Sequence, residues 1–131
     1  APVVTRLPVS WLYPMGEAQQ KRTPKFSKYF LENDIIAGDF HFIRKFMPDT
    51  LPEKTIITNT VTSDDRAMLK KAGVKLLITT TPCLEGRSFG TNVMEAMLVA
   101  VKGAQAPLTA AEYIDLLEEY KIESSIEYLN T

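Results

Sequence analysis

Residues 55–79 read TIITNTVTSDDRAMLKKAGVKLLIT and contain a strand, a helix and a second strand in succession. The runs at 55–59 and 75–79 are short and apolar, which is typical of strands that are covered on both faces. Between them, Ser63 is placed to cap a helix with aspartates in its first turn and lysines in its last, and Gly73 is placed to end it. This order predicts a βαβ unit with two parallel strands.

The same alternation extends toward the N-terminus. Residues 3–7 are a candidate strand. A helix is expected to begin at Thr23, with Pro24 in the first helical position, where its missing N–H costs nothing. A short buried strand at 35–38 and a further helical turn at 41–46 follow. Strands and helices are therefore expected to alternate from the start of the chain.

The C-terminal third contains two predicted helices. Residues 91–102 are apolar nearly all round, so this helix is expected to be largely buried. Thr109 and Glu112 form the capping box of the next helix, and residues 125–129 are either an edge strand or irregular. The whole pattern predicts a single α/β domain over residues 1–131, a three-layer, Rossmann-like domain with a mostly parallel sheet.

The composition is that of a globular protein and excludes several classes. Of the 131 residues, 45% are hydrophobic and 24% are charged, which excludes disordered and fibrous chains. There are 15 basic and 16 acidic residues, so no nucleic-acid partner is expected. No apolar run is long enough for a membrane span, and the single cysteine fits a reducing, cytoplasmic location. Because Ala1 lies just before a candidate strand, the chain is expected to be the C-terminal part of a longer protein.

Hydrogen-bonding side chains follow three of the predicted strands. Asp39, Asn59 and Thr80 each come at or just after the carboxyl end of a strand. In open parallel sheets, ligands bind beyond these ends, so the three side chains are candidates for one ligand site. The alternative is structural, because Asp, Asn and Thr also favour turns and helix caps.

The only histidine lies beside the first of these strand ends. His41 is close in sequence to Asp39 and Arg44, a group suited to general acid–base chemistry on a hydroxyl or carbonyl, with Asp39 orienting the imidazole. Asp39 and His41 are therefore the candidate catalytic residues, and Arg44 is a candidate ligand-binding residue. The alternative is that His41 is an ordinary hydrogen-bonded side chain. One histidine and scattered carboxylates give no metal-ligand spacing, and Cys83 has no identifiable activating base.

A long connection precedes the predicted apolar helix. Residues 85–92 read EGRSFGTN, in which glycines let the backbone approach a ligand and N–H groups at a helix N-terminus attract anions. Arg87 adds a bidentate grip on a carboxylate or phosphate, with Ser88 and Asn92 beside it as candidate ligand-binding residues. The alternative is that Ser88 or Thr91 caps the helix while Arg87 is solvated. The segment lacks the G-K-[ST] of a Walker loop.

Motifs spread over nearly the whole chain resemble those of one bacterial family. They are RLP (6–8), WLYP (11–14), GE (16–17), AGDFHFIR (37–44), ITNT (57–60) and GRSFGTNVMEA (86–96). The chain resembles the C-terminal half of the family whose members carry the label quinate 5-dehydrogenase. This resemblance implies nicotinamide-dependent oxidation of a cyclic hydroxy acid in the manner of shikimate dehydrogenases, with NAD or NADP as the cofactor.

Shikimate-type dehydrogenases share a G-x-G-x-x-[GA] loop and a catalytic Lys/Asp pair, and this sequence has neither motif. The resemblance therefore implies a missing N-terminal half that supplies these parts, while this chain contributes loops to a cofactor or hydroxy-acid site. Two alternatives stay open. One is a non-catalytic domain that binds a small anionic metabolite at the same strand ends. The other is an interaction domain that docks a partner or, as a homodimer, a second copy.

Overall fold

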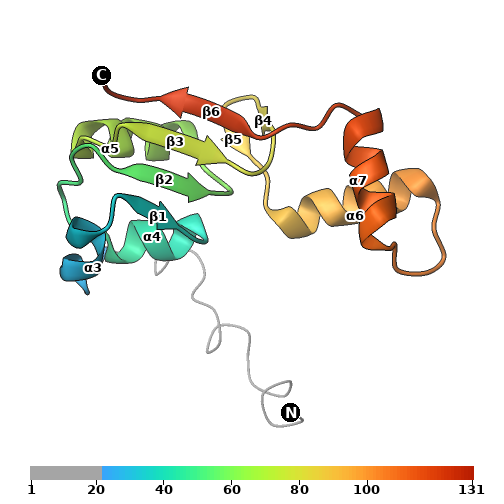
Figure 1. The fold of residues 1–131 in the computed structure, drawn as a ribbon, viewed down its shortest axis with the longest axis horizontal. Coiled ribbons are helices and arrows are strands. Elements are labelled where there is room, and N and C mark those ends of the chain that lie inside the picture. Colours follow the sequence, from blue (N-terminus) through green and yellow to red (C-terminus); the bar gives the residue numbers. More distant parts are fainter. Residues whose placement is uncertain (1–21) are drawn as a thin grey trace, which may run out of the picture.

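The computed structural model describes residues 22–131, apart from the side chain of Leu84, so the strand predicted at 3–7 lies outside the described residues. Helices and strands alternate along most of this part of the chain (Figure 1). In chain order they are α3 (Ser27–Glu32), β1 (Ile35–Ala37), α4 (Phe40–Phe46), β2 (Thr55–Thr58), α5 (Ser63–Ala72), β3 (Leu76–Thr79), β4 (Cys83–Leu84), β5 (Arg87–Ser88), α6 (Thr91–Lys102), α7 (Ala110–Glu119) and β6 (Ser125–Tyr128).

Four strands form one sheet in the order β1-β2-β3-β6 (Figure 1). β1, β2 and β3 run parallel, with Ile36, Ile56 and Leu77 side by side, and β6 pairs antiparallel with β3. The predicted α/β class and mostly parallel sheet are confirmed, and the C-terminal segment forms an edge strand. The hairpin β4–β5 lies within residues 80–90, where the sequence predicted only a long connection.

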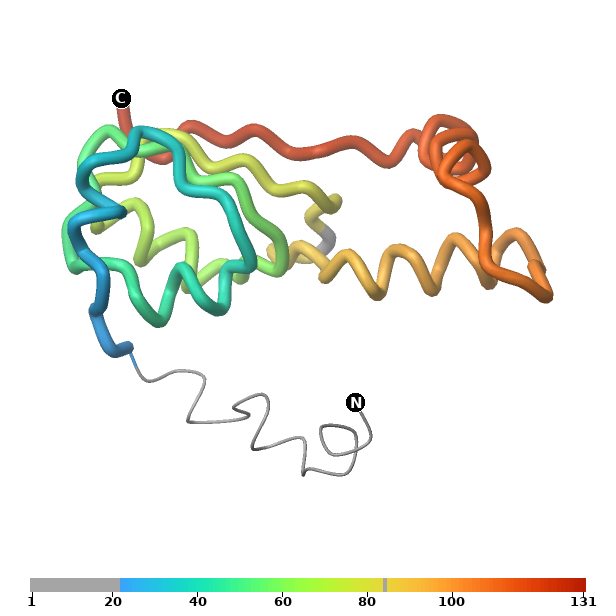
Figure 2. The backbone as a smooth tube through the Cα atoms, turned by 60° about the horizontal axis from the view of Figure 1, so that its bottom comes forward, coloured from blue at the N-terminus to red at the C-terminus, as the bar shows by residue number. Residues whose placement is uncertain are grey.

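Helices α4 and α5 cover one face of the sheet (Figure 1 and Figure 2). The core lies between these layers. Ile56 and Leu77 of the sheet belong to one cluster with Phe40 and Ile43 of α4 and Leu69 of α5, and none of the five is more than 4% exposed. Burying an apolar side chain of this size contributes about 1.5–3 kcal/mol. This layer therefore holds β1, β2 and β3 and their carboxyl ends in place.

The opposite face of the sheet carries no helix in the part of the chain that the structure describes. Its side chains alternate with the buried ones along each strand, as the period of two requires. We call this set the open face, and its members are Ile35, Ala37, Thr55, Ile57, Leu76, Ile78, Ile126 and Tyr128. Ile126 is 63% exposed and Tyr128 is 73% exposed, so the face is apolar and in contact with solvent in the single chain.

Helices α6 and α7 stand beyond the carboxyl ends of β1–β3 and not over the sheet (Figure 1 and Figure 2). None of their residues belongs to the core cluster. α6 buries only Met94 and Leu98, whereas Val93, Met97 and Val101 are exposed. The prediction that this helix is largely buried is therefore wrong for the single chain. A third layer over the sheet is not seen among the described residues.

Two helix starts differ from those predicted. α3 begins at Ser27, after Phe26 in the left-handed region at φ 59°, and not at Thr23. α5 is capped by Thr62, so that Ser63 is its first residue. None of the described helices is both long enough and apolar enough to cross a bilayer.

Candidate functional site

A cavity of about 510 Å³ opens at the carboxyl ends of β1 and β2. Three segments line it: the two strand ends, β5 with the residues after it, and the first turn of α6. The lining residues are Asp39, Asn59, Thr60, Arg87, Ser88, Phe89, Gly90, Thr91, Asn92 and Val93. Five predicted site residues are thus brought together, namely Asp39, Asn59, Arg87, Ser88 and Asn92. The other three, His41, Arg44 and Thr80, are not among the lining residues.

The N-terminus of α6 forms one wall of the cavity. The helix begins at Thr91, and its N-cap residue, Gly90, has no side chain that accepts a hydrogen bond. The Gly90 carbonyl accepts from the N–H groups of Val93 at 3.1 Å and Met94 at 3.2 Å. Since the first N–H groups of a helix have no partner within it, this wall presents donors and a positive helix end. No side chain caps α6, so the alternative that Ser88 or Thr91 caps it is wrong.

The cavity carries one cationic and one anionic side chain among its lining residues. Arg87 is exposed on β5, and Asp39 follows β1. The guanidinium and the N-terminus of α6 both favour a negative group, while the Asp39 carboxylate accepts hydrogen bonds and repels excess negative charge. The arrangement therefore suits a ligand with one carboxylate and several hydroxyls better than a highly charged phosphate.

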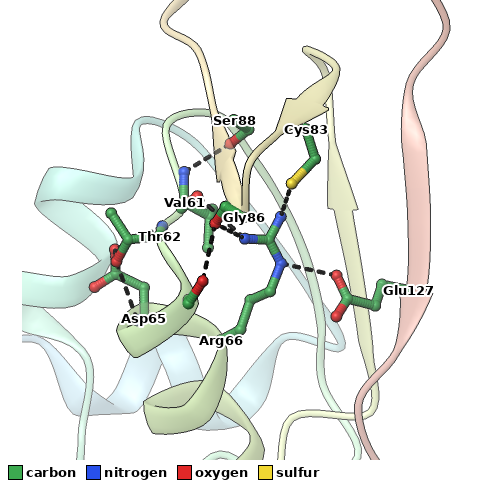
Figure 3. A network of polar contacts seen from close by, with 9 residues as sticks. Val61, Thr62, Asp65, Arg66, Cys83, Gly86, Ser88 and Glu127 are labelled. Atoms are coloured by element: carbon green, nitrogen blue, oxygen red, sulfur yellow. Dashed lines mark hydrogen bonds and ion pairs between the residues drawn. The ribbon is translucent and has the colours of Figure 1, made fainter.

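Ser88 holds the hairpin against the segment that follows β2. It is fully buried. Its Oγ accepts from the Val61 N–H at 2.7 Å, and its N–H donates to the Val61 carbonyl at 3.0 Å (Figure 3). These bonds fix the strand that carries Arg87. Ser88 therefore has a structural role at the cavity, in addition to its candidate role in ligand binding.

Arg66 of α5 is a second support for the hairpin, and the sequence analysis did not identify it. Its Nη1 donates to the Gly86 carbonyl at 2.9 Å, and its Nη2 to the Cys83 Sγ at 3.3 Å (Figure 3). Its Nε pairs with Glu127 Oε2 of β6 at 2.9 Å. Only 14% of the Arg66 side chain is exposed, so these charge-assisted bonds lie in a desolvated place. One guanidinium therefore ties α5, the hairpin and the edge strand together.

Two residues after β2 are unusual. The Oδ1 atom of Asn59 is buried and has no hydrogen-bond partner among the described residues. Thr60 lies in the left-handed region at φ 45°. This conformation is costly for a β-branched residue, and such outliers cluster at ligand sites. Asn59 offers an unused acceptor, and Thr60 is a site candidate that no sequence pattern signals.

The predicted acid–base trio is not gathered in the cavity. Asp39 Oδ1 accepts from the backbone N–H of His41 at 2.9 Å, which makes it the N-cap of α4. The His41 ring lies edge-on to the Phe42 ring, with centroids 5.4 Å apart. Arg44 pairs with buried Asp65 at 3.0 Å and so joins α4 to α5. His41 remains at the same end of the sheet as the cavity, two residues from Asp39.

A second cavity of about 400 Å³ lies between the end of β3 and the helices α6 and α7. Thr80 lines it with mainly apolar side chains of both helices, and Thr91 lines both cavities. At its edge, the Tyr113 hydroxyl donates to Glu95 Oε1 at 3.0 Å. Desolvation raises the pKa of Tyr113 above its usual value, and the hydrogen bond to Glu95 adds to the rise. Glu95 is thus paired with a neutral phenol.

Metal ligands are not gathered in this region. Within residues 22–131, no three His, Cys, Asp or Glu side chains lie close enough to hold an ion together.

Comparison with known proteins identifies the family of the chain. The sequence model of a family described as Domain of unknown function (DUF8754) matches residues 1–129. No curated protein and no solved structure matches this chain.

Proposed function

The chain belongs to the DUF8754 family, and we propose that it binds a small hydroxylated carboxylic acid in the cavity at the carboxyl ends of β1 and β2. The observation that carries this proposal is the uncapped N-terminus of α6, which lines the same cavity as Arg87. Ligands of open parallel sheets bind at this end of the strands, and helix N-termini bind anions.

Each part of the cavity has a separate role in this proposal. Arg87 and the first N–H groups of α6 hold the carboxylate. Asn59 Oδ1, which has no partner among the described residues, accepts a hydrogen bond from a ligand hydroxyl. The second oxygen of the Asp39 carboxylate does the same. Asn92 and Ser88 complete the wall.

The resemblance to the quinate 5-dehydrogenase family supports a cyclic hydroxy acid as the ligand. In that proposal, this chain completes the acid site of a cytoplasmic quinate- or shikimate-type dehydrogenase, and an N-terminal half binds NAD or NADP. Asp39 and His41 are then the candidates for proton transfer from the ligand hydroxyl. A non-catalytic domain that binds the same class of acid is the alternative, and the cavity supports it equally.

We further propose that the working domain has the three layers of a Rossmann-like fold. α4 and α5 provide one outer layer. The apolar composition of the open face supports a second cover, because mostly parallel sheets are found with both faces covered.

Calorimetric titration of the chain with quinate tests the proposed site. Arg87→Ala should weaken binding about tenfold to a hundredfold, because a charge-assisted hydrogen bond contributes about 1.5–3 kcal/mol. Arg87→Lys should recover only part of the affinity, since an ammonium cannot form the bidentate pair. Lys71→Ala, on the exposed side of α5, is the matched control and should bind as the wild type does.

The melting temperature separates binding from folding in this experiment. Arg87 is exposed, so its removal should leave the melting temperature nearly unchanged. Unchanged affinity in Arg87→Ala, or a large drop in its melting temperature, would contradict the proposed role.

A further inference from the structure

We propose that two copies of this chain form a dimer in which the arm of each copy, residues 91–124 with helices α6 and α7, covers the open face of the other. Within residues 22–131, two apolar surfaces have no helix or strand packed on them. One belongs to the sheet and the other to the helices, and the inference rests on how well they match.

The open face is the first surface. Ile35, Ile126 and Tyr128 are each at least 60% exposed, and Ile57 and Ile78 lie between them in the register of the sheet. Exposed apolar patches of this kind on a soluble domain mark places where another element packs.

The arm carries the second surface. Met97 and Val101 of α6 and Ile114 of α7 are each at least 46% exposed. Because α6 is apolar nearly all round, the helix is expected to be buried on more than one side. Its own partner, α7, covers only the side that holds Met94 and Leu98. On the remaining apolar side, Met97 and Val101 are exposed among the described residues.

The place of the arm in the topology points to the sheet as its partner. The arm connects the hairpin after β3 to β6, and β3 and β6 are neighbours in the sheet. Helices that connect the strands of such a sheet normally pack on its faces. Here both helices stand beyond the strand ends (Figure 2). A helix pair that extends beyond its own sheet can reach the sheet of a second copy. Protomers that exchange an element in domain-swapped dimers have this geometry.

Charge and size both fit this pairing. The arm carries six acidic residues and two lysines, whereas residues 22–90 and 125–131, which include all four strands of the sheet, carry eleven basic and nine acidic residues. An arm therefore meets a body of opposite sign. Twelve residues of α6 span about 18 Å, close to the width of about 19 Å of four strands. A specific interface buries at least about 1,000 Å² in total, so the proposal requires both open faces of the dimer to be covered.

Sedimentation equilibrium on the full chain tests the proposal. The wild type should be a dimer. Ile126→Lys with Tyr128→Lys, on the open face, and Met97→Lys with Val101→Lys, on the arm, should each weaken dimerisation at least tenfold. Phe42→Lys, on the exposed surface of α4 and so on the other side of the sheet, is the matched control and should remain dimeric. All these side chains are exposed in the single chain, so circular dichroism should show folded protein in every case.

Mixing the two variants distinguishes the arm-on-sheet dimer from other dimers. Each mixed pair keeps one intact contact, between the wild-type arm of the face variant and the wild-type face of the arm variant. The mixture should therefore associate more tightly than either variant alone, and more weakly than the wild type, which keeps both contacts. A monomeric wild type, dimers that persist in either variant, or no recovery on mixing would each overturn the proposal.

Discussion

Among the glycines that the structure describes, Gly86 has the least room for a side chain. It lies at φ 80°, and a Cβ atom there would come within 2.5 Å of Ser63 Oγ. Glu85, before it, also has a positive φ of 51°. Two such residues in succession are typical of the tight turn of a two-residue hairpin. The Gly86 carbonyl accepts from Arg66, so this one residue fixes the hairpin that presents Arg87.

Gly86→Ala should therefore destabilise the protein more than Gly103→Ala. Both residues have a positive φ, so each substitution costs about 1–2 kcal/mol of backbone strain. Only Gly86 adds a steric clash, since nothing lies within 4 Å of the Cβ position at Gly103. Urea unfolding of both variants measures the difference. Equal losses of unfolding free energy would show that Ser63 moves aside without cost.

The start of helix α7 follows from a short sequence motif, the capping box. The Thr109 Oγ accepts from the Glu112 N–H at 3.3 Å, and Glu112 Oε2 accepts from the Thr109 N–H at 2.8 Å. This is the predicted capping box, and it is confirmed. The backbone hydrogen bond from Thr109, followed by its hydroxyl bond, lowers the pKa of Glu112. Ionised Glu112 therefore stabilises the start of α7 above its ordinary pKa, and this contribution is lost as the pH falls through the lowered pKa.

Thr109→Ala should raise the pKa of Glu112 part of the way toward its usual value. The hydroxyl bond is lost, while the backbone bond remains. Loss of the cap should also destabilise the protein by about 1 kcal/mol. Carboxyl-carbon NMR titration gives the pKa, and Thr109→Ser, which keeps the hydroxyl, is the control. A Glu112 pKa that is the same in all three proteins would refute this account of the cap.

Sequence separation explains which elements and contacts could be predicted. The strands, the capping box of α7 and the strand-end residues Asp39 and Asn59 follow from neighbours within a few positions. Arg66 could not be identified, because its partners Cys83 and Glu127 are 17 and 61 residues away. The ion pair between Arg44 and Asp65 could not be predicted for the same reason, because the two residues are far apart in the sequence. The hairpin has a local signal in Glu85–Gly86, because a glycine in a two-residue connection favours the positive φ of a hairpin turn.

At the scale of the whole molecule, the proposed acid site and the proposed dimer contact share one segment of the chain. The first turn of α6, from Thr91 to Val93, lines the cavity and is also the base of the arm. The described sheet is covered on one face by the chain's own helices, and the cavity opens beyond its carboxyl ends. The sequence lacks the G-x-G-x-x-G motif that forms the pyrophosphate-binding turn of dinucleotide-binding domains.

Residues 1–131 should therefore bind NAD and NADH weakly and show no dehydrogenase activity alone. The physical reason is the absence of the glycine turn that lets a backbone approach the pyrophosphate. Calorimetric titration with either dinucleotide measures this directly, with quinate as the ligand for comparison. Micromolar affinity for NADH would show that the chain binds the cofactor by a route other than the glycine fingerprint.

The most direct test of the acid site is an amide NMR titration of the ¹⁵N-labelled chain with quinate. The account predicts saturable shifts in the N–H signals of Asn59, Thr60 and residues 90–93, with the same half-saturation for all of them. In Arg87→Ala, the same signals should move only at about tenfold to a hundredfold higher quinate concentrations. Shifts confined to the second cavity around Tyr113, or no saturable shifts at residues 90–93, would contradict the proposal that the N-terminus of α6 binds the carboxylate.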